Sequence, residues 1–162
     1  KGEITRDIIS ICDFSQSCNN KRMYVIDLSS GTLLYNTLVA HGRNTGEEFA
    51  RYFSNQNSTH KSSLGFYVTE DKFNSKLGTC LRLKGMEPGF NDRAESRGII
   101  VHGASYVSEN FITNYGTCGR SWGCPAVPMK DIESVVDLIK DGTCLFIYAP
   151  DRTYMALSKM VK

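Results

Sequence analysis

The amino-acid sequence predicts one mainly β domain with a helix near its C-terminus. Apolar runs of strand length, rich in β-branched and aromatic residues and bounded by turn residues, recur along the chain. Only residues 129–140 place apolar side chains at helical spacing over a longer stretch. The chain has 162 residues, which is the size of one domain and enough to bury a core without disulfide staples. We therefore expect a single domain over residues 1–162.

The first strands are expected as a β-hairpin. Residues 23–28 and 32–35 are two β-prone runs on either side of Ser29-Ser30-Gly31, which is a turn signal. Further strands are predicted at residues 64–69, 79–83, 98–102 and 143–148. Strands therefore account for most of the regular structure that we expect.

The expected helix covers residues 129–140. Pro128 would lie in its first turn, and Gly142 would follow its end. The positions i, i+3, i+4 and i+7 of this segment are apolar, namely Ile132, Val135, Val136 and Ile139. This pattern is typical of a helix that packs one face on a core.

Two long irregular stretches separate these elements. Residues 41–63 are rich in Gly, Asn, Ser, Thr and His, and a short helix is possible over residues 47–53. Residues 103–128 are rich in Gly, Ser and Tyr. Because long loops in compact domains often carry function, these stretches are the first places to look for a site.

Charge and composition exclude several classes of protein. The chain has 19 basic and 17 acidic residues, and this net charge of +2 is too small for the basic surface of a nucleic-acid-binding protein. No apolar run approaches the roughly 18 residues that a membrane span needs. The first residue is Lys1 and not Met, so we expect a mature or trimmed product whose export signal would lie outside this sequence.

The cysteines do not form a metal-binding pattern. No C-x-x-C pair occurs, and the two C-x5-C spacings are not those of usual zinc ligands. Cys144 stands in an apolar run and is expected to be a buried core thiol. If Cys124 is a free nucleophile, at most two disulfides can form, and the sequence leaves their pairing open. The six cysteines are Cys12, Cys18, Cys80, Cys118, Cys124 and Cys144.

Cys124 is the candidate nucleophile because of the segment around it, Ser121-Trp122-Gly123-Cys124-Pro125. Gly123 permits a tight turn, and Pro125 and Pro128 keep the following residues out of a regular ladder, so the thiol would project from a bend. Backbone N–H groups that are free at such a bend can form an oxyanion hole. A thiol with an ordinary pKa of about 8.5 also needs a nearby base to react at neutral pH.

His102 is the favoured base. It ends the predicted strand 98–102 and is followed by Gly103, so a rigid element would present its imidazole at the start of a loop. His41 has a similar local sequence and is a rival base, and either histidine could instead be a hydrogen-bonded structural residue. His60 lies in a polar loop and is expected to be solvated.

Other side chains in these loops could contact a substrate. Arg93, Arg97 and Arg120 could clamp a carboxylate, although arginines lie more often at the surface or in ion pairs. Trp122 could cover a substrate or pack beneath the loop, and packing is the favoured interpretation.

The linked blocks resemble the catalytic domain of L,D-transpeptidases of the YkuD type, whose signature is His-Gly at a strand end, a loop, and then Ser/Thr-His-Gly-Cys. The blocks are residues 62–67, 97–104 and 119–128, and they resemble the murein L,D-transpeptidase branch in particular. The similarity runs from about residue 23 to residue 148. Trp122 stands where the wider signature has a second histidine, which removes one polar group from the site.

The resemblance implies a β-sandwich-like catalytic domain, without metal or cofactor, that acts in the periplasm or cell envelope. Cys124 would attack the third-residue carbonyl of a peptidoglycan tetrapeptide stem, release D-Ala and pass the acyl group to an amine of an acceptor stem. His102 would be the base, and the backbone carbonyl of Gly103 would complete its triad. Ser121, Gly123 and the nucleophile itself would frame the oxyanion site. Nucleic acid is not an expected partner, and we expect a monomer.

Two other functions stay open. A cysteine carboxypeptidase or endopeptidase on the same scaffold would pass the acyl group to water. A non-catalytic wall-binding module would leave Cys124 unreactive or disulfide-bonded, for instance to Cys118.

Overall fold

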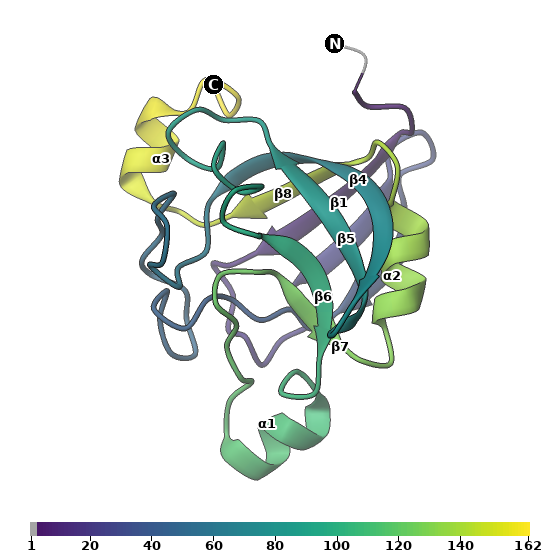
Figure 1. Cartoon of the computed structure of the whole chain (residues 1–162), viewed down its shortest axis with the longest axis vertical. Coiled ribbons are helices and arrows are strands. Elements are labelled where there is room, and N and C mark those ends of the chain that lie inside the picture. The colour runs from purple at the N-terminus through teal and green to yellow at the C-terminus, as the bar shows by residue number, and fades with distance from the viewer. Residues whose placement is uncertain (1–2) are drawn as a thin grey trace.

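The computed structural model describes residues 3–162 and contains one strongly curved β-sheet with three helices around it (Figure 1). This confirms the mainly β class and the helix near the C-terminus. The eight strands are β1 Ile8–Asp13, β2 Met23–Asp27, β3 Thr32–Thr37, β4 Gly65–Ser75, β5 Gly78–Gly85, β6 Ile100–Ala104, β7 Ala126–Pro128 and β8 Cys144–Tyr148. The helices are α1 Glu109–Tyr115, α2 Ile132–Ile139 and α3 Arg152–Leu157. Within residues 3–162, no helix has the length and apolar character that crossing a membrane requires.

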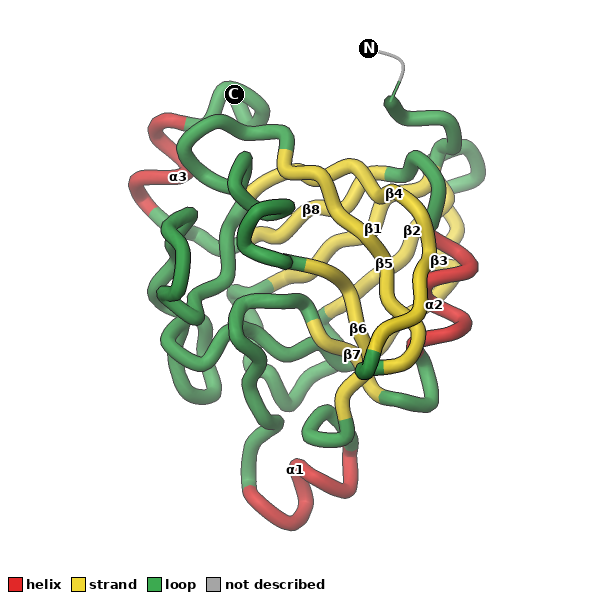
Figure 2. Tube along the Cα trace, viewed as in Figure 1, coloured by secondary structure: helices red, strands yellow, loops and turns green. Residues whose placement is uncertain are grey.

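The strands follow the order β3-β2-β1-β8-β4-β5-β6-β7 across the sheet. The pairs β1/β8 and β6/β7 are parallel, and the other neighbours are antiparallel. Figure 2 shows the curvature of β4, β5 and β6. Ala40, which follows edge strand β3, donates its N–H to the carbonyl of Ala126 in edge strand β7 at 2.8 Å. The curl of the sheet therefore brings its two ends together beside the residues that follow Cys124.

Helix α2 packs on the sheet through its predicted apolar face. The buried residues of this face belong to the main core, and α2 contacts β1, β4, β5 and β6. The helix begins at Ile132, later than predicted, because Pro128 ends strand β7 and is not in a first helical turn. Asp131 lies at its N-cap, but the carboxylate accepts hydrogen bonds from Tyr35 and Thr37 instead. The buried face comprises Ile132, Val135, Val136 and Ile139.

The other predicted strands are present with shifted ends. Strands β2 and β3 form the expected antiparallel hairpin. The runs predicted at 64–69 and 79–83 are parts of a longer hairpin, in which β4 continues to Ser75 and β5 begins at Gly78. Strand β6 starts two residues later than predicted, at Ile100. Strands β1 and β7 and helices α1 and α3 were not predicted.

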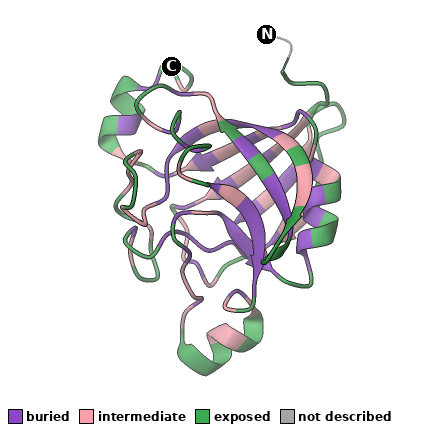
Figure 3. Ribbon diagram, in the orientation of Figure 1, coloured by how far each residue is buried: buried purple, intermediate pink, exposed green. Residues whose placement is uncertain are grey.

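The loops differ from the prediction at two places. Residues 47–53 are not helical, because the N–H groups of Arg51 and Tyr52 both return to the carbonyl of Thr45. The stretch 103–128 contains α1, which begins at an N-cap serine, Ser108, and ends at a glycine with a φ of 80°. No residue of α1 is buried, and the helix stands out from the domain (Figure 3).

The buried carboxylate of Glu87 fixes helix α3. Glu87 accepts hydrogen bonds from the N–H of Phe66 at 2.8 Å, from the hydroxyl of Tyr154 at 2.8 Å and from Ser158 at 2.5 Å. These donors satisfy both oxygens of a side chain that is otherwise costly to bury. Helix α3 is thereby attached to the start of β4.

Candidate active site

Ser121 shapes the loop that carries Cys124. Its hydroxyl accepts the N–H of Gly123 at 3.1 Å and donates to the carbonyl of Cys124 at 2.6 Å. Its own backbone is fixed to the neighbouring loop: Ser121 N–H donates to the carbonyl of His41 at 3.0 Å, and Arg43 N–H donates to the carbonyl of Ser121 at 2.7 Å. The bend predicted around Cys124 is therefore held by four hydrogen bonds that converge on one serine.

Gly123 permits a backbone contact that other residues would prevent. Its φ is +122°, and a Cβ atom there would lie 2.8 Å from the carbonyl oxygen of Lys61. Gly42 is equally tight, since its Cβ would lie 2.6 Å from the carbonyl oxygen of His60. Both glycines pack against the backbone of residues 60–62. The backbones around Gly42, Gly123 and residues 60–62 therefore meet without side chains between them.

The thiol of Cys124 is partly exposed and lies beside the start of β6. Its Sγ is 3.5 Å from the N–H of Ile100 and 3.5 Å from the carbonyl oxygen of Gly98. Burial raises the pKa of the Cys124 thiol, whereas the Ile100 N–H and the positive charge of Arg97 lower it in part. A thiol with a raised pKa is mainly protonated at neutral pH, so the site needs a base.

His102 lies on β6, two residues after Ile100, whose N–H borders this thiol. Its backbone N–H donates to the carbonyl of Pro125, the residue after Cys124, at 3.4 Å. Its Nδ1 is 3.0 Å from the carbonyl oxygen of Gly103. Because a carbonyl only accepts, Nδ1 carries a proton in this contact, and in the neutral tautomer the lone pair is therefore on Nε2. The neutral imidazole can therefore act as a proton acceptor through Nε2.

His41 is a buried structural residue in this arrangement. Its Nδ1 accepts a hydrogen bond from Arg22 at 2.8 Å, and its Nε2 donates to the carbonyl of Gly46 at 3.0 Å. Burial and the charge of Arg22 lower the pKa of His41 to about 4. Both ring nitrogens are occupied, so the imidazole of this rival base has none left for a substrate. What reaches the site is its backbone carbonyl, which accepts from Ser121.

The arginines considered as carboxylate clamps have protein partners. The guanidinium of Arg97 ties the 54–63 loop together through hydrogen bonds, and only its charge acts on Cys124. Arg120 pairs with Glu47 at 3.0 Å on the surface. Arg93 is exposed, and within residues 3–162 its guanidinium forms no hydrogen bond or ion pair. The partners of Arg97 are the carbonyls of Ser54 and Lys61 and the hydroxyls of Thr59 and Ser63.

Trp122 is 71% exposed, so the prediction that it packs beneath the loop is wrong. Its ring stacks on His60 with centroids 4.9 Å apart and planes 9° apart, and His60 is therefore more than a solvated loop residue. Trp122 also borders a surface hollow of about 350 Å³. A larger hollow of about 720 Å³ lies between β3, α1 and the start of α2, and neither Cys124 nor His102 lines it.

The remaining cysteines and potential metal ligands do not add to this site. All six cysteines are free thiols, so Cys124 is not bonded to Cys118. Cys144 is half-buried at the start of β8 and is not the core thiol that was expected. In the part of the chain that the structure describes, no three His, Cys, Asp or Glu side chains gather as a metal site. The N–H of Ile100 was missed by sequence reasoning, since a backbone group leaves no signal in the residue type.

Comparisons with known proteins identify the family of this chain. The model of the L,D-transpeptidase catalytic domain matches residues 1–148. No match is found among curated proteins. A solved structure of L,D-transpeptidase 3 from Mycobacterium tuberculosis, in complex with a faropenem-derived adduct, is 14% identical with a TM-score of 0.57 and covers 88% of this chain and 60% of its own.

Two further solved structures have similar folds. An L,D-transpeptidase from Mycobacterium smegmatis is 13% identical with a TM-score of 0.55, over 88% of this chain and 59% of that one. The helical cell shape determining protein Pgp2 from Campylobacter jejuni is 18% identical with a TM-score of 0.54, over 90% of this chain and 48% of that one. The chain thus spans less than two thirds of these neighbours, and at such identities the likeness shows the fold. Because the family model covers most of the sequence, this chain belongs to the L,D-transpeptidase catalytic-domain family.

Proposed function

We propose that this chain is a peptidoglycan L,D-transpeptidase of the cell envelope, with Cys124 as nucleophile and His102 as general base. The observation that best supports this proposal is the 3.0 Å contact between His102 Nδ1 and the carbonyl oxygen of Gly103. It leaves Nε2 as the proton acceptor on the strand that also borders the Cys124 thiol. Gly103 thus acts through its backbone, as the third member of the triad.

In the first half-reaction, the thiol attacks the carbonyl carbon of the third residue in a tetrapeptide stem. We expect this residue to be meso-diaminopimelate, attacked at its L-centre. His102 Nε2 takes the thiol proton as the C–S bond forms, and it then protonates the D-Ala amine as the peptide C–N bond breaks. The raised pKa of Cys124 fits this order, because a protonated thiol must lose its proton during attack.

In the second half-reaction, an amine of an acceptor stem attacks the thioester. His102 now accepts a proton from this amine and returns one to the departing thiolate of Cys124. If water enters in place of the amine, the same acyl-enzyme gives hydrolysis. The choice between transfer and hydrolysis therefore depends on access of the acceptor and leaves the first half-reaction unchanged.

The backbone N–H of Cys124 is the proposed oxyanion donor. Across residues 3–162 it has no hydrogen-bond partner, whereas the N–H of Gly123 is already donated to Ser121. Gly123 and Ser121 then support the oxyanion site by fixing the bend, and neither donates directly. A single oxyanion donor typically contributes about 3–4 kcal/mol to the transition state.

A non-catalytic wall-binding module is less compatible with these observations. That function would place Cys124 in a disulfide or out of reach, yet its thiol is free and partly exposed. A carbapenem can test this directly, because these β-lactams imitate the acyl donor of the family. The solved neighbour with a faropenem-derived adduct makes a β-lactam probe reasonable here.

The first experiment is intact-mass spectrometry after incubation with a carbapenem. We expect one covalent adduct on the wild type, none on Cys124→Ala, and an unchanged adduct on Cys144→Ala, which removes the other partly exposed thiol. His102→Gln should acylate roughly 10²–10⁴-fold more slowly. Adduct formation on Cys124→Ala, or none on a wild type whose Cys124 is reduced and alkylatable, would overturn the proposed nucleophile.

A second experiment separates transfer from hydrolysis. A tetrapeptide stem is incubated with the enzyme, with and without an amine-bearing acceptor stem, and D-Ala release and crosslinked product are quantified. Crosslinked product with the acceptor supports the transpeptidase. D-Ala release that is unchanged by the acceptor, with no crosslink, would identify a carboxypeptidase instead.

A further inference from the structure

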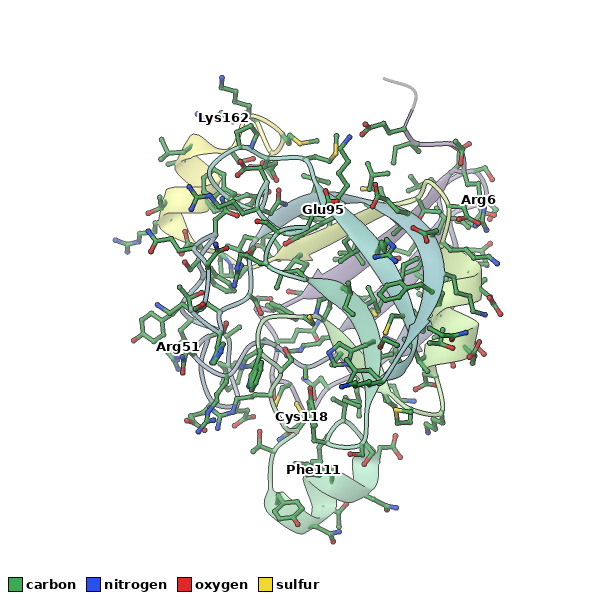
Figure 4. All side chains as sticks on the ribbon, in the orientation of Figure 1. Arg6, Arg51, Glu95, Phe111, Cys118 and Lys162 are labelled. Carbon is green, nitrogen blue, oxygen red and sulfur yellow. The ribbon has the colours of Figure 1, made fainter. Side chains whose placement is uncertain are left out.

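Cys18 and Cys118 are distant in the sequence and buried together. They are 0% and 1% exposed. Asn19 joins their two segments: its Nδ2 donates to the carbonyl of Gly116 at 3.1 Å, and its Oδ1 accepts the N–H of Cys118 at 3.3 Å. In Figure 4, Cys118 lies above α1, where the loop after this helix returns to the sheet. The turn after β1 and the loop after α1 are therefore already in contact at these thiols.

The two thiols form a polarised pair. The hydrogen bond from the Cys118 thiol lowers the pKa of Cys18, and the hydroxyl of Thr117, 3.1 Å from Cys18 Sγ, acts in the same direction. Interaction with Cys18, together with burial, raises the pKa of Cys118. Arg22, which is buried nearby, favours the thiolate of Cys18 by its charge. Cys18 is thus the better nucleophile of the pair, as thiol–disulfide exchange requires.

We propose that Cys18 and Cys118 are a disulfide-forming pair that ties the catalytic loop to the turn after β1. The Cys18 thiolate attacks a low-molecular-weight disulfide, forms a mixed disulfide and expels one thiolate. The Cys118 thiolate then attacks the Cys18 sulfur and expels the second. The balance is two protein thiols plus one disulfide giving one protein disulfide plus two small thiols.

The position of the bond gives it a consequence for the site. Cys118 precedes Ser121 closely in the sequence, and Ser121 holds the bend of Cys124. A bond to Cys18 would fix the start of this loop to the turn after β1 and would close a loop of about 100 residues in the unfolded chain. The expectation that this protein folds in a compartment where disulfides persist rests on the proposed envelope function. The pairing of the two cysteines does not depend on that function.

Peptide mapping tests the pairing. The wild-type chain is refolded with excess oxidised glutathione, its free thiols are blocked with N-ethylmaleimide in denaturant, and it is digested without reductant. We expect a crosslinked peptide pair containing Cys18 and Cys118, with Cys124 alkylated. Recovery of both Cys18 and Cys118 as alkylated peptides, or of either one bonded to a different cysteine, would overturn the proposal.

Thermal unfolding supplies an independent measurement. The oxidised wild type should melt roughly 5–15 °C higher than the dithiothreitol-reduced wild type. Cys18→Ser and Cys118→Ser should lose this redox dependence, while Cys144→Ser should keep it. Equal melting of oxidised and reduced wild type would refute the tether even if a serine variant fails to fold. Neither measurement involves acylation of Cys124, so a failed carbapenem reaction would leave this result interpretable.

Discussion

Gly123→Ala tests how the loop positions the proposed nucleophile, Cys124. The backbone φ of +122° costs an L side chain about 1–3 kcal/mol. The added Cβ would also stand 2.8 Å from the carbonyl oxygen of Lys61, and forcing apart two packed backbones costs about a further 1–3 kcal/mol. We therefore expect a loss of about 2–6 kcal/mol in the free energy of unfolding, which is a large share of the 5–15 kcal/mol typical of a domain.

The matched control is Gly31→Ala. Gly31 also has a positive φ, +70°, but a Cβ there meets no atom within 4 Å. This variant should lose only about 1–2 kcal/mol of the free energy of unfolding, because of its strained backbone. Its acylation rate should not change. Urea unfolding followed by circular dichroism gives both free energies. The fluorescence of Trp122, the sole tryptophan, reports on the loop around Cys124 in the same samples.

The acylation rate distinguishes loop displacement from general destabilisation. At low temperature, where both variants are folded, Gly123→Ala should react with a carbapenem roughly 10²-fold more slowly than the wild type, because a displacement of about 1 Å is that costly. If Gly123→Ala were as stable as Gly31→Ala and acylated at the wild-type rate, the reasoning about this contact would be refuted.

Two further predictions concern the same loop. Ser121→Ala removes the acceptor for Gly123 N–H and the donor to the carbonyl of Cys124, so it should cost about 1–3 kcal/mol in urea unfolding and slow acylation. Ser121→Thr keeps the hydroxyl and should acylate much faster than Ser121→Ala, and equal rates for the two would contradict the role of the hydroxyl. Alkylation of Cys124 by iodoacetamide, read by peptide mass, should rise with pH through a midpoint above the ~8.5 of free cysteine, because burial raises the pKa of this thiol and only the thiolate reacts. A midpoint below neutrality would instead indicate a preformed thiolate–imidazolium pair.

Much of the site could be predicted from residue order because its key residues are local. The block from Ser121 to Cys124 encodes its own bend, since Ser121 bonds to both Gly123 and Cys124. His102 and Gly103 are adjacent, so the contact that fixes the imidazole tautomer needs no distant partner. Likewise the four apolar residues of α2 have a periodicity that predicts their burial whatever they pack against.

Other features could not be inferred because their partners are distant in the chain. His41 and His102 look alike in sequence, and only Arg22, which reaches the Nδ1 of His41 in the folded domain, separates a structural histidine from a candidate base. From its sequence context Arg97 could bind a ligand, but in the folded domain its guanidinium bonds to the 54–63 loop. The partners of Ser121 in the loop of His41 are equally invisible to local patterns.

The sequence by itself determined the mainly β class and the amphipathic helix, and it singled out Cys124 and His102 as the candidate residue pair. Tertiary structure alone decided the parallel pairing of β1 with β8, the burial of His41 and the meeting of Cys18 with Cys118. The physical reason is one of range. Periodicity and turn chemistry act over a few residues, whereas burial and hydrogen-bond partners depend on which surfaces the folded sheet brings together.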